Sequence, residues 1–180
     1  MDPVSTPEQW RDAFVVIGTA AGALVGLLFV VISLHLDRIT ERTDANMRMT
    51  VDGARNNTLH LLTVLVEAVA VLTPQPPLML GLELIALNLF GLRLPLGIVR
   101  RYFDKNVTIS ERGGFPMRLI VTVAGAYALG AAGGVAAIAR ADWALYLVAA
   151  SCVIKLVRTV LTAWMLMFGM FNPPPPKAEI

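Results

Sequence analysis

Long apolar runs alternate with short polar connections along this chain. A helix needs about 20 residues to cross the ~30 Å hydrocarbon core of a bilayer. The pattern predicts five such helices, over residues 13–36, 57–73, 78–99, 117–139 and 143–171. We therefore expect residues 1–171 to form one all-α, polytopic membrane helix bundle with five transmembrane helices. A proline-rich cytoplasmic tail is expected at residues 172–180.

The segments between the apolar runs support these boundaries. Thr6, Pro7 and Gln9 follow the pattern of a helix start, with an N-cap, a first-position proline and a capping-box residue. The prolines within residues 73–77 cannot continue a helix, so they separate the second run from the third. The segment before the first run has no basic region, so this run is predicted to be a membrane helix and not a cleaved signal peptide.

Basic residues lie mainly in two of the connections. One side of the predicted bundle holds Arg38, Arg42, Arg48, Arg55, Arg100, Arg101, Lys105, Arg112, Arg118 and Lys177. The other side holds only Arg11 and Arg140. Because cytoplasmic loops of membrane proteins are rich in Lys and Arg, this asymmetry predicts an outside N-terminus and a cytoplasmic C-terminus.

The composition excludes several classes of protein. Hydrophobic residues make up 56% of the chain and charged residues 16%, against about 25% charged residues in soluble domains. A soluble enzyme and a nucleic-acid partner are therefore not expected. The one cysteine, Cys152, excludes an intrachain disulfide and a cysteine metal cage. No catalytic motif occurs, so the chain is predicted to be non-enzymatic and to need no cofactor or metal.

Glycines recur every four residues in the first run, at Gly18, Gly22 and Gly26, as in a glycine zipper. Gly130 and Gly134 repeat the spacing in the fourth run. Residues four apart share a helix face, and small residues there let another backbone approach closely. Two interpretations stay open: a face for self-association into an oligomer, or ordinary packing between helices of one chain.

Ionisable side chains interrupt the apolar runs. Besides His60 they are Glu67, Glu83, Arg93, Lys155 and Arg158. Two polar stripes follow helical spacing: His60, Thr63 and Glu67, which continue from Asn56, and Ser151, Lys155, Arg158 and Thr162. Since a charge near a helix centre costs at least ~2.5–3.5 kcal/mol, we expect these side chains to face one another, a polar cavity or a partner.

The depths of the charges predict their pairing. At ~1.5 Å per residue, Glu67 and Glu83 lie about 9 Å and about 8 Å from the same end of the bundle, and the long side chain of Lys155 reaches that depth. We expect ion pairs between Glu67 and Lys155 and between Glu83 and an arginine. These pairs either fix helix register or line a path that relays protons or ions. His60 is expected to form hydrogen bonds and not to bind a metal, because no second ligand lies at a suitable spacing.

Three stretches carry a resemblance to a known family: GTAAGALVGLLFVVISLHLDRI with Trp10 before it, LMLGLELIALNLFGL, and LTAWMLMF. They resemble a family of small bacterial integral membrane proteins, some of which are labelled modulator of FtsH protease. The resemblance implies a multi-pass protein of the bacterial inner membrane that acts as a membrane partner or regulator. It implies no catalytic chemistry. The leading hypothesis is thus an oligomerising accessory or regulatory subunit, and the alternative is an oligomeric ion or proton channel or ion-coupled transporter.

Overall fold

A computed structural model describes residues 7–34, 45–103 and 117–171 of the chain. Every regular element in these ranges is an α-helix. In chain order they are α1 (Pro7–Leu34), α3 (Ala45–Leu72), α4 (Pro77–Phe103), α5 (Met117–Ile138) and α6 (Ala144–Phe171). The all-α prediction is confirmed for these residues. The predicted tail at 172–180 and the predicted N-cap Thr6 lie outside them.

The helices begin and end close to the predicted positions, with one exception. The start of α1 at Pro7 and of α4 at Pro77 agrees with the preference for proline in the first turn. The exception is α3, which begins at Ala45 although its apolar run begins only at residue 57. The prediction located apolar segments, whereas a helix continues into polar sequence wherever its outer turns leave the hydrocarbon region.

Three of the described helices are long and apolar enough to cross a membrane, over Glu8–Val30, Val121–Ile138 and Ala144–Trp164. Their outward faces carry large apolar side chains, such as Phe29 with 71% of its surface exposed and Val16 with 67%. A water-soluble domain of this size does not expose such a continuous apolar surface. These features indicate a membrane protein.

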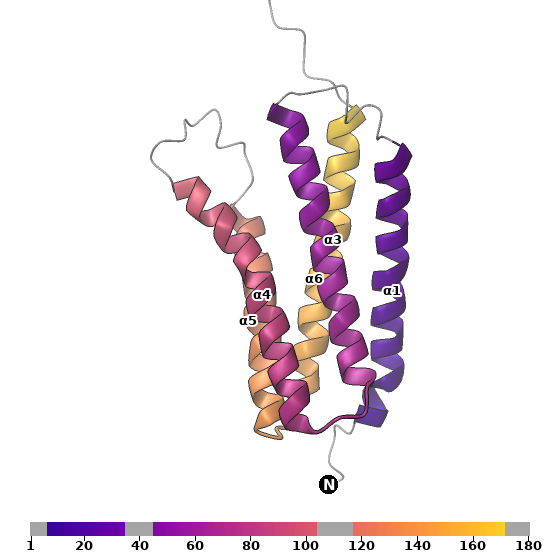
Figure 1. Cartoon of the computed structure of the whole chain (residues 1–180), viewed down its shortest axis with the longest axis vertical. Helices are drawn as coiled ribbons and strands as arrows, with labels where there is room; N and C mark the ends of the chain where they lie inside the picture. The colour runs from indigo at the N-terminus through magenta and orange to yellow at the C-terminus, as the bar shows by residue number, and fades with distance from the viewer. Residues whose placement is uncertain (1–6, 35–44, 104–116, 172–180) are drawn as a thin grey trace, which may run out of the picture.

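The helices alternate in direction and form a bundle with two different ends (Figure 1). We call the end that carries the connections at residues 73–76 and 139–143 the hairpin end, and the opposite end the loop end. At the hairpin end the turn between α5 and α6 places Arg140 in the left-handed region, with φ 56°. α5 packs extensively against both α4 and α6, while α1 packs mainly against α3. Toward the loop end, α4 and α5 lean away from α3 and α6 (Figure 1).

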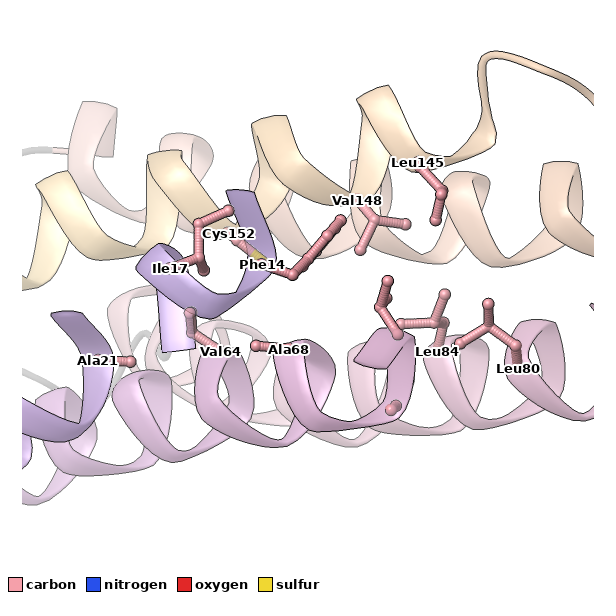
Figure 2. Close-up of a cluster of buried hydrophobic side chains, with 12 residues drawn as sticks. Phe14, Ile17, Ala21, Val64, Ala68, Leu80, Leu84, Leu145, Val148 and Cys152 are labelled. Carbon is pink, nitrogen blue, oxygen red and sulfur yellow. The ribbon is translucent and has the colours of Figure 1, made fainter. Parts of the chain in front are cut away.

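The apolar core lies in the hairpin-end half of the bundle, where α1, α3, α4 and α6 meet (Figure 2). The ring of Phe14 is fully buried there and points between Val148 and Cys152 of α6. Ala21 of α1 and Ala68 of α3 are small, and a Cβ at Gly18 of α1 would lie only 3.2 Å from Ala68 Cβ, so these two helices lie close together. The core fixes the helices around the polar residues described next.

Candidate functional site

Four of the helices each contribute to one buried polar cluster. We call it the polar node; it consists of Glu67 on α3, Asn88 on α4, Tyr127 on α5, and Cys152 and Lys155 on α6. None of these residues exposes more than 2% of its surface. Glu67 and Lys155 form the ion pair that the sequence predicts, with Lys155 Nζ 2.7 Å from Glu67 Oε1.

Both members of this pair make further contacts. Lys155 Nζ donates a second hydrogen bond to Asn88 Oδ1 at 2.8 Å, and it lies 4.5 Å from the centroid of the Tyr127 ring. The Cys152 thiol donates to Glu67 Oε2 at 3.1 Å. Buried charges are stable only when they are paired and hydrogen-bonded, and a cation over an aromatic face gains further attraction. The node therefore meets the energetic requirement for burying a charge in an apolar medium.

A second hydrogen-bonded group adjoins the node on the side of the loop end. The Asn56 amide donates to His60 Nε2 at 2.9 Å, so a neutral His60 ring carries its proton on Nδ1. His60 Nδ1 then donates to the Tyr127 hydroxyl, at 2.6 Å. The expectation that His60 forms hydrogen bonds is confirmed. Tyr127 thus touches both groups, through its hydroxyl on one side and its ring on the other.

The other members of the two predicted stripes bond mainly to backbone. The buried Ser151 hydroxyl donates to the carbonyl of Ala126 at 2.7 Å, which ties α6 to α5. Thr63 and Thr162 donate to carbonyls four residues earlier in their own helices. Arg158 is partly buried, and its Nε has no hydrogen-bond partner in the described part of the chain. Both stripes therefore face the interior of the bundle.

Two of the predicted charged residues do not join the cluster, so the expected pairing of Glu83 with an arginine is wrong within the described residues. Glu83 is exposed, and its carboxylate accepts a hydrogen bond from Gln75 at 3.0 Å. Arg93 is exposed and lies 5.8 Å from the Phe90 ring centroid. The reason is helical phase: each is five residues from Asn88, a rotation of about 140° away from the face that Asn88 presents to the node.

The glycines fall into two groups. A Cβ at Gly18 would lie 3.2 Å from Ala68 Cβ, and one at Gly134 would lie 2.7 Å from the carbonyl oxygen of Gly81. A Cβ at Gly130 would collide with the Asn88 side chain. These three glycines serve packing within one chain. At Gly22 and Gly26 a Cβ would meet no atom within 4 Å, so only this part of the predicted glycine face is open.

Three members of these groups were missed from sequence: Asn88, Tyr127 and Cys152 as a hydrogen-bond donor. Asn88 was detectable as the only uncharged polar residue within the apolar run 78–99, whereas Tyr127 gave no comparable signal. The described residues contain no group of three or more His, Cys, Asp or Glu side chains that could hold a metal ion. Comparisons with protein-family models, curated proteins and solved structures find no match to this chain.

Proposed function

We propose that this chain is a five-span protein of the bacterial inner membrane that acts as a non-enzymatic accessory or regulatory subunit, by binding other membrane helices. In this proposal α3 and α4 also cross the bilayer, the N-terminus is outside and the C-terminus is cytoplasmic. The distribution of Lys and Arg supports the orientation. The resemblance to bacterial membrane modulators supports the class of function.

The open glycine positions on α1 carry this proposal. α1 packs mainly against α3, and only 11% of the residues in its most apolar window are buried. Gly22 and Gly26 leave a strip of accessible backbone, flanked by the exposed side chains of Leu27 and Phe29. In lipid, where no hydrophobic driving force brings helices together, close backbone approach at small residues is a main source of helix association. A second copy of this chain or a helix of a partner protein fits this strip.

The mass of the native complex in lipid nanodiscs tests the proposal. We expect the wild-type chain to run as a homo-oligomer or with a membrane partner. Replacing Gly22 and Gly26 together by leucine should dissociate the complex without unfolding the bundle. The matched control is Gly125→Leu on α5, where a Cβ also meets no atom within 4 Å. A stable wild-type monomer without companions would overturn the proposal, and so would equal behaviour of the two variants.

A second candidate function is an oligomeric ion or proton channel, or an ion-coupled transporter, with a polar path along α3 and α6. The observation that favours it is the polar node itself, because ionisable residues inside a membrane commonly mark ion or proton pathways. Ion and proton flux should be measured in liposomes for the wild-type chain, Glu67→Gln and Lys155→Met. Flux that both variants abolish supports this candidate, and its absence from well-folded wild-type protein removes it.

A further inference from the structure

The interior of the bundle differs in polarity on the two sides of the polar node. Between Glu67 and the hairpin end, the facing side chains are apolar and at most 8% exposed; they are Val71, Leu80, Leu84, Leu145 and Val148. Figure 2 shows this apolar region, to which α4 contributes Leu80 and Leu84 and α6 contributes Leu145 and Val148. Water does not enter a narrow space lined only by such side chains. The node is therefore sealed from the hairpin end.

Close helix packing strengthens the seal. Near the hairpin end, a Cβ on Gly81 of α4 would strike the backbone of Gly134 on α5. A Cβ on the neighbouring Gly133 would lie 2.7 Å from Val148 Cγ2 on α6. At these contacts the helices lie closer together than side chains would allow, which leaves no room for a chain of water molecules.

Polar side chains occupy the interior on the other side of the node. Asn57, His60, Thr159 and Thr162 are each at most 8% exposed, and they lie on α3 and α6 between the node and the loop end. The Asn57 amide donates to the carbonyl of Thr159 at 3.4 Å, so the two helices share a hydrogen-bonded contact there. α4 and α5 lean away from these helices toward the same end (Figure 1). These polar side chains can exchange their mutual hydrogen bonds for hydrogen bonds to water. The apolar side chains between the node and the hairpin end cannot form such bonds.

We call Asn57, His60, Thr159 and Thr162 the polar column. Tyr127 lies where this column meets the node. Its ring is fully buried and fills the space beside Gly91, where a Cβ would overlap the ring. The ring covers Lys155 Nζ, while the hydroxyl is held by His60. The Thr159 hydroxyl also reaches the node, but only at the backbone carbonyl of Lys155, to which it donates at 2.9 Å. Tyr127 is the side chain that contacts both His60 and the Lys155 ammonium. Moving this ring would uncover the Lys155 ammonium on the side that faces His60.

We propose that the polar node is an occluded proton-binding site that exchanges with water at the loop end only, with Tyr127 as its gate. When the ring moves, hydronium transfers a proton to a Glu67 carboxylate oxygen, which forms a neutral acid and leaves water. Lys155 stays an ammonium and keeps its hydrogen bond to Asn88 Oδ1. Because it loses its counter-charge, as it would in Glu67→Gln, the protonated node is higher in free energy than the ion pair. A metal cation does not fit, because the Lys155 ammonium already occupies Glu67 Oε1 and Asn88 Oδ1, the oxygens that such a cation would need, and repels it.

The charged and titratable groups around Glu67 agree with this assignment. α6 presents Lys155 and Cys152, with Arg158 one turn further along, and α5 presents Tyr127. His60 lies on α3 itself, and α4 presents the uncharged Asn88. The described residues of α1 that pack here are apolar. Glu67 is thus the only carboxylate among the described residues of the node, and it is the group whose charge a proton would remove.

Cys152 is a native probe of access, since its thiol lies beside Glu67 and it is the only cysteine in the chain. A charged, membrane-impermeant methanethiosulfonate reagent should be added to one side of oriented vesicles that contain the full chain. We expect slow labelling of the wild type from the loop-end side and none from the hairpin-end side. Tyr127→Phe should speed loop-end labelling by about tenfold, the factor that one buried hydrogen bond supplies.

Three further variants control this experiment. His60→Leu removes the same hydrogen bond from the other side and should have a similar effect on labelling. Phe14→Leu leaves an apolar void in the core on the hairpin-end side of the node. It should admit no charged reagent from the hairpin end, because an apolar void stays dry. Cys152→Ala should remain unlabelled. Labelling from the hairpin end, or a folded Tyr127→Phe protein that labels no faster than the wild type, would overturn the gate.

Proton binding needs its own measurement. Infrared difference spectra after a pH drop on the loop-end side should show the carbonyl band of a protonated acid, and Glu67→Gln should remove it. A band that follows the hairpin-end pH, or one that survives in Glu67→Gln, contradicts the assignment, as does the absence of any band. The inference deepens the second candidate function, but it requires no steady flux of ions or protons. If well-folded protein gave no flux in sealed liposomes, the channel proposal would be wrong, whereas the proposed one-sided proton site would not be contradicted. It does not depend on the oligomer proposal.

Discussion

The side chain of Asn88 occupies the space that Gly130 leaves open between α4 and α5. A Cβ at Gly130 would overlap the Asn88 amide group. Asn88 Nδ2 donates to the Leu84 carbonyl at 2.8 Å, which orients Oδ1 toward Lys155. A glycine in one helix thus determines where the hydrogen-bond acceptor for a lysine in another helix can lie. Helix packing and the geometry of the polar node are therefore coupled.

Gly130→Ala should destabilise the bundle by about 1–3 kcal/mol, because the added methyl group must displace Asn88 in a packed interior. The displacement also weakens the second hydrogen bond of Lys155. Gly125→Ala is the control, since a Cβ there meets nothing within 4 Å and alanine favours the helix by up to ~1 kcal/mol. Unfolding by SDS titration in bicelles measures both. Equal stability of the two variants would show that Asn88 moves aside at no cost.

The Glu67–Lys155 pair should show strong energetic coupling. Glu67→Gln or Lys155→Met alone leaves one buried charge without its partner, which costs about 3–5 kcal/mol. The double variant contains no charge at this position, so we expect it to regain most of that loss. The same SDS titration over the four proteins gives the coupling energy. Additive losses would mean that the two side chains do not interact in the folded bundle.

The sequence predicted this ion pair because two properties are readable without coordinates. Charge identifies the residues that need partners in an apolar medium, and the rise of a helix gives their depths. Helix rotation is not readable in this way. The expected arginine partner for Glu83 failed because the inward face of α4 is the one that carries Gly81, Leu84 and Asn88. That choice depends on which face fits closely against α5, and a single sequence gives no measure of fit.

Tyr127 shows a second limit of sequence reasoning. A tyrosine in an apolar run is compatible with a lipid-facing position, so it creates no energetic demand of the kind that a buried charge makes. Its place in the node depends on Gly91 of α4, which leaves room for the ring. Two residues from different helices jointly determine this contact, and neither of them indicates it alone.

Tyr127→Phe should lower stability by about 1–3 kcal/mol, because His60 Nδ1 is buried and loses its only described partner. The ring and its contact with Lys155 remain, so the fold should persist. Tyr146→Phe is the matched control: Tyr146 is exposed and packs edge-on against Trp10 through its ring, with centroids 4.6 Å apart. The stability of Tyr146→Phe should stay within about 0.5 kcal/mol of the wild type. A harmless Tyr127→Phe would show that water replaces the hydroxyl.

Glu83→Gln tests the outward placement of Glu83. The carboxylate is exposed and its described partner is the neutral Gln75 amide, so removing its charge leaves no cation unpaired among the described residues. We expect a change within about 0.5 kcal/mol, as for other exposed substitutions. Glu67→Gln makes the same chemical change one helix away, where Lys155 depends on the carboxylate. If both variants lost several kcal/mol in the same titration, Glu83 would have a buried cationic partner, and the assigned rotation of α4 would be wrong.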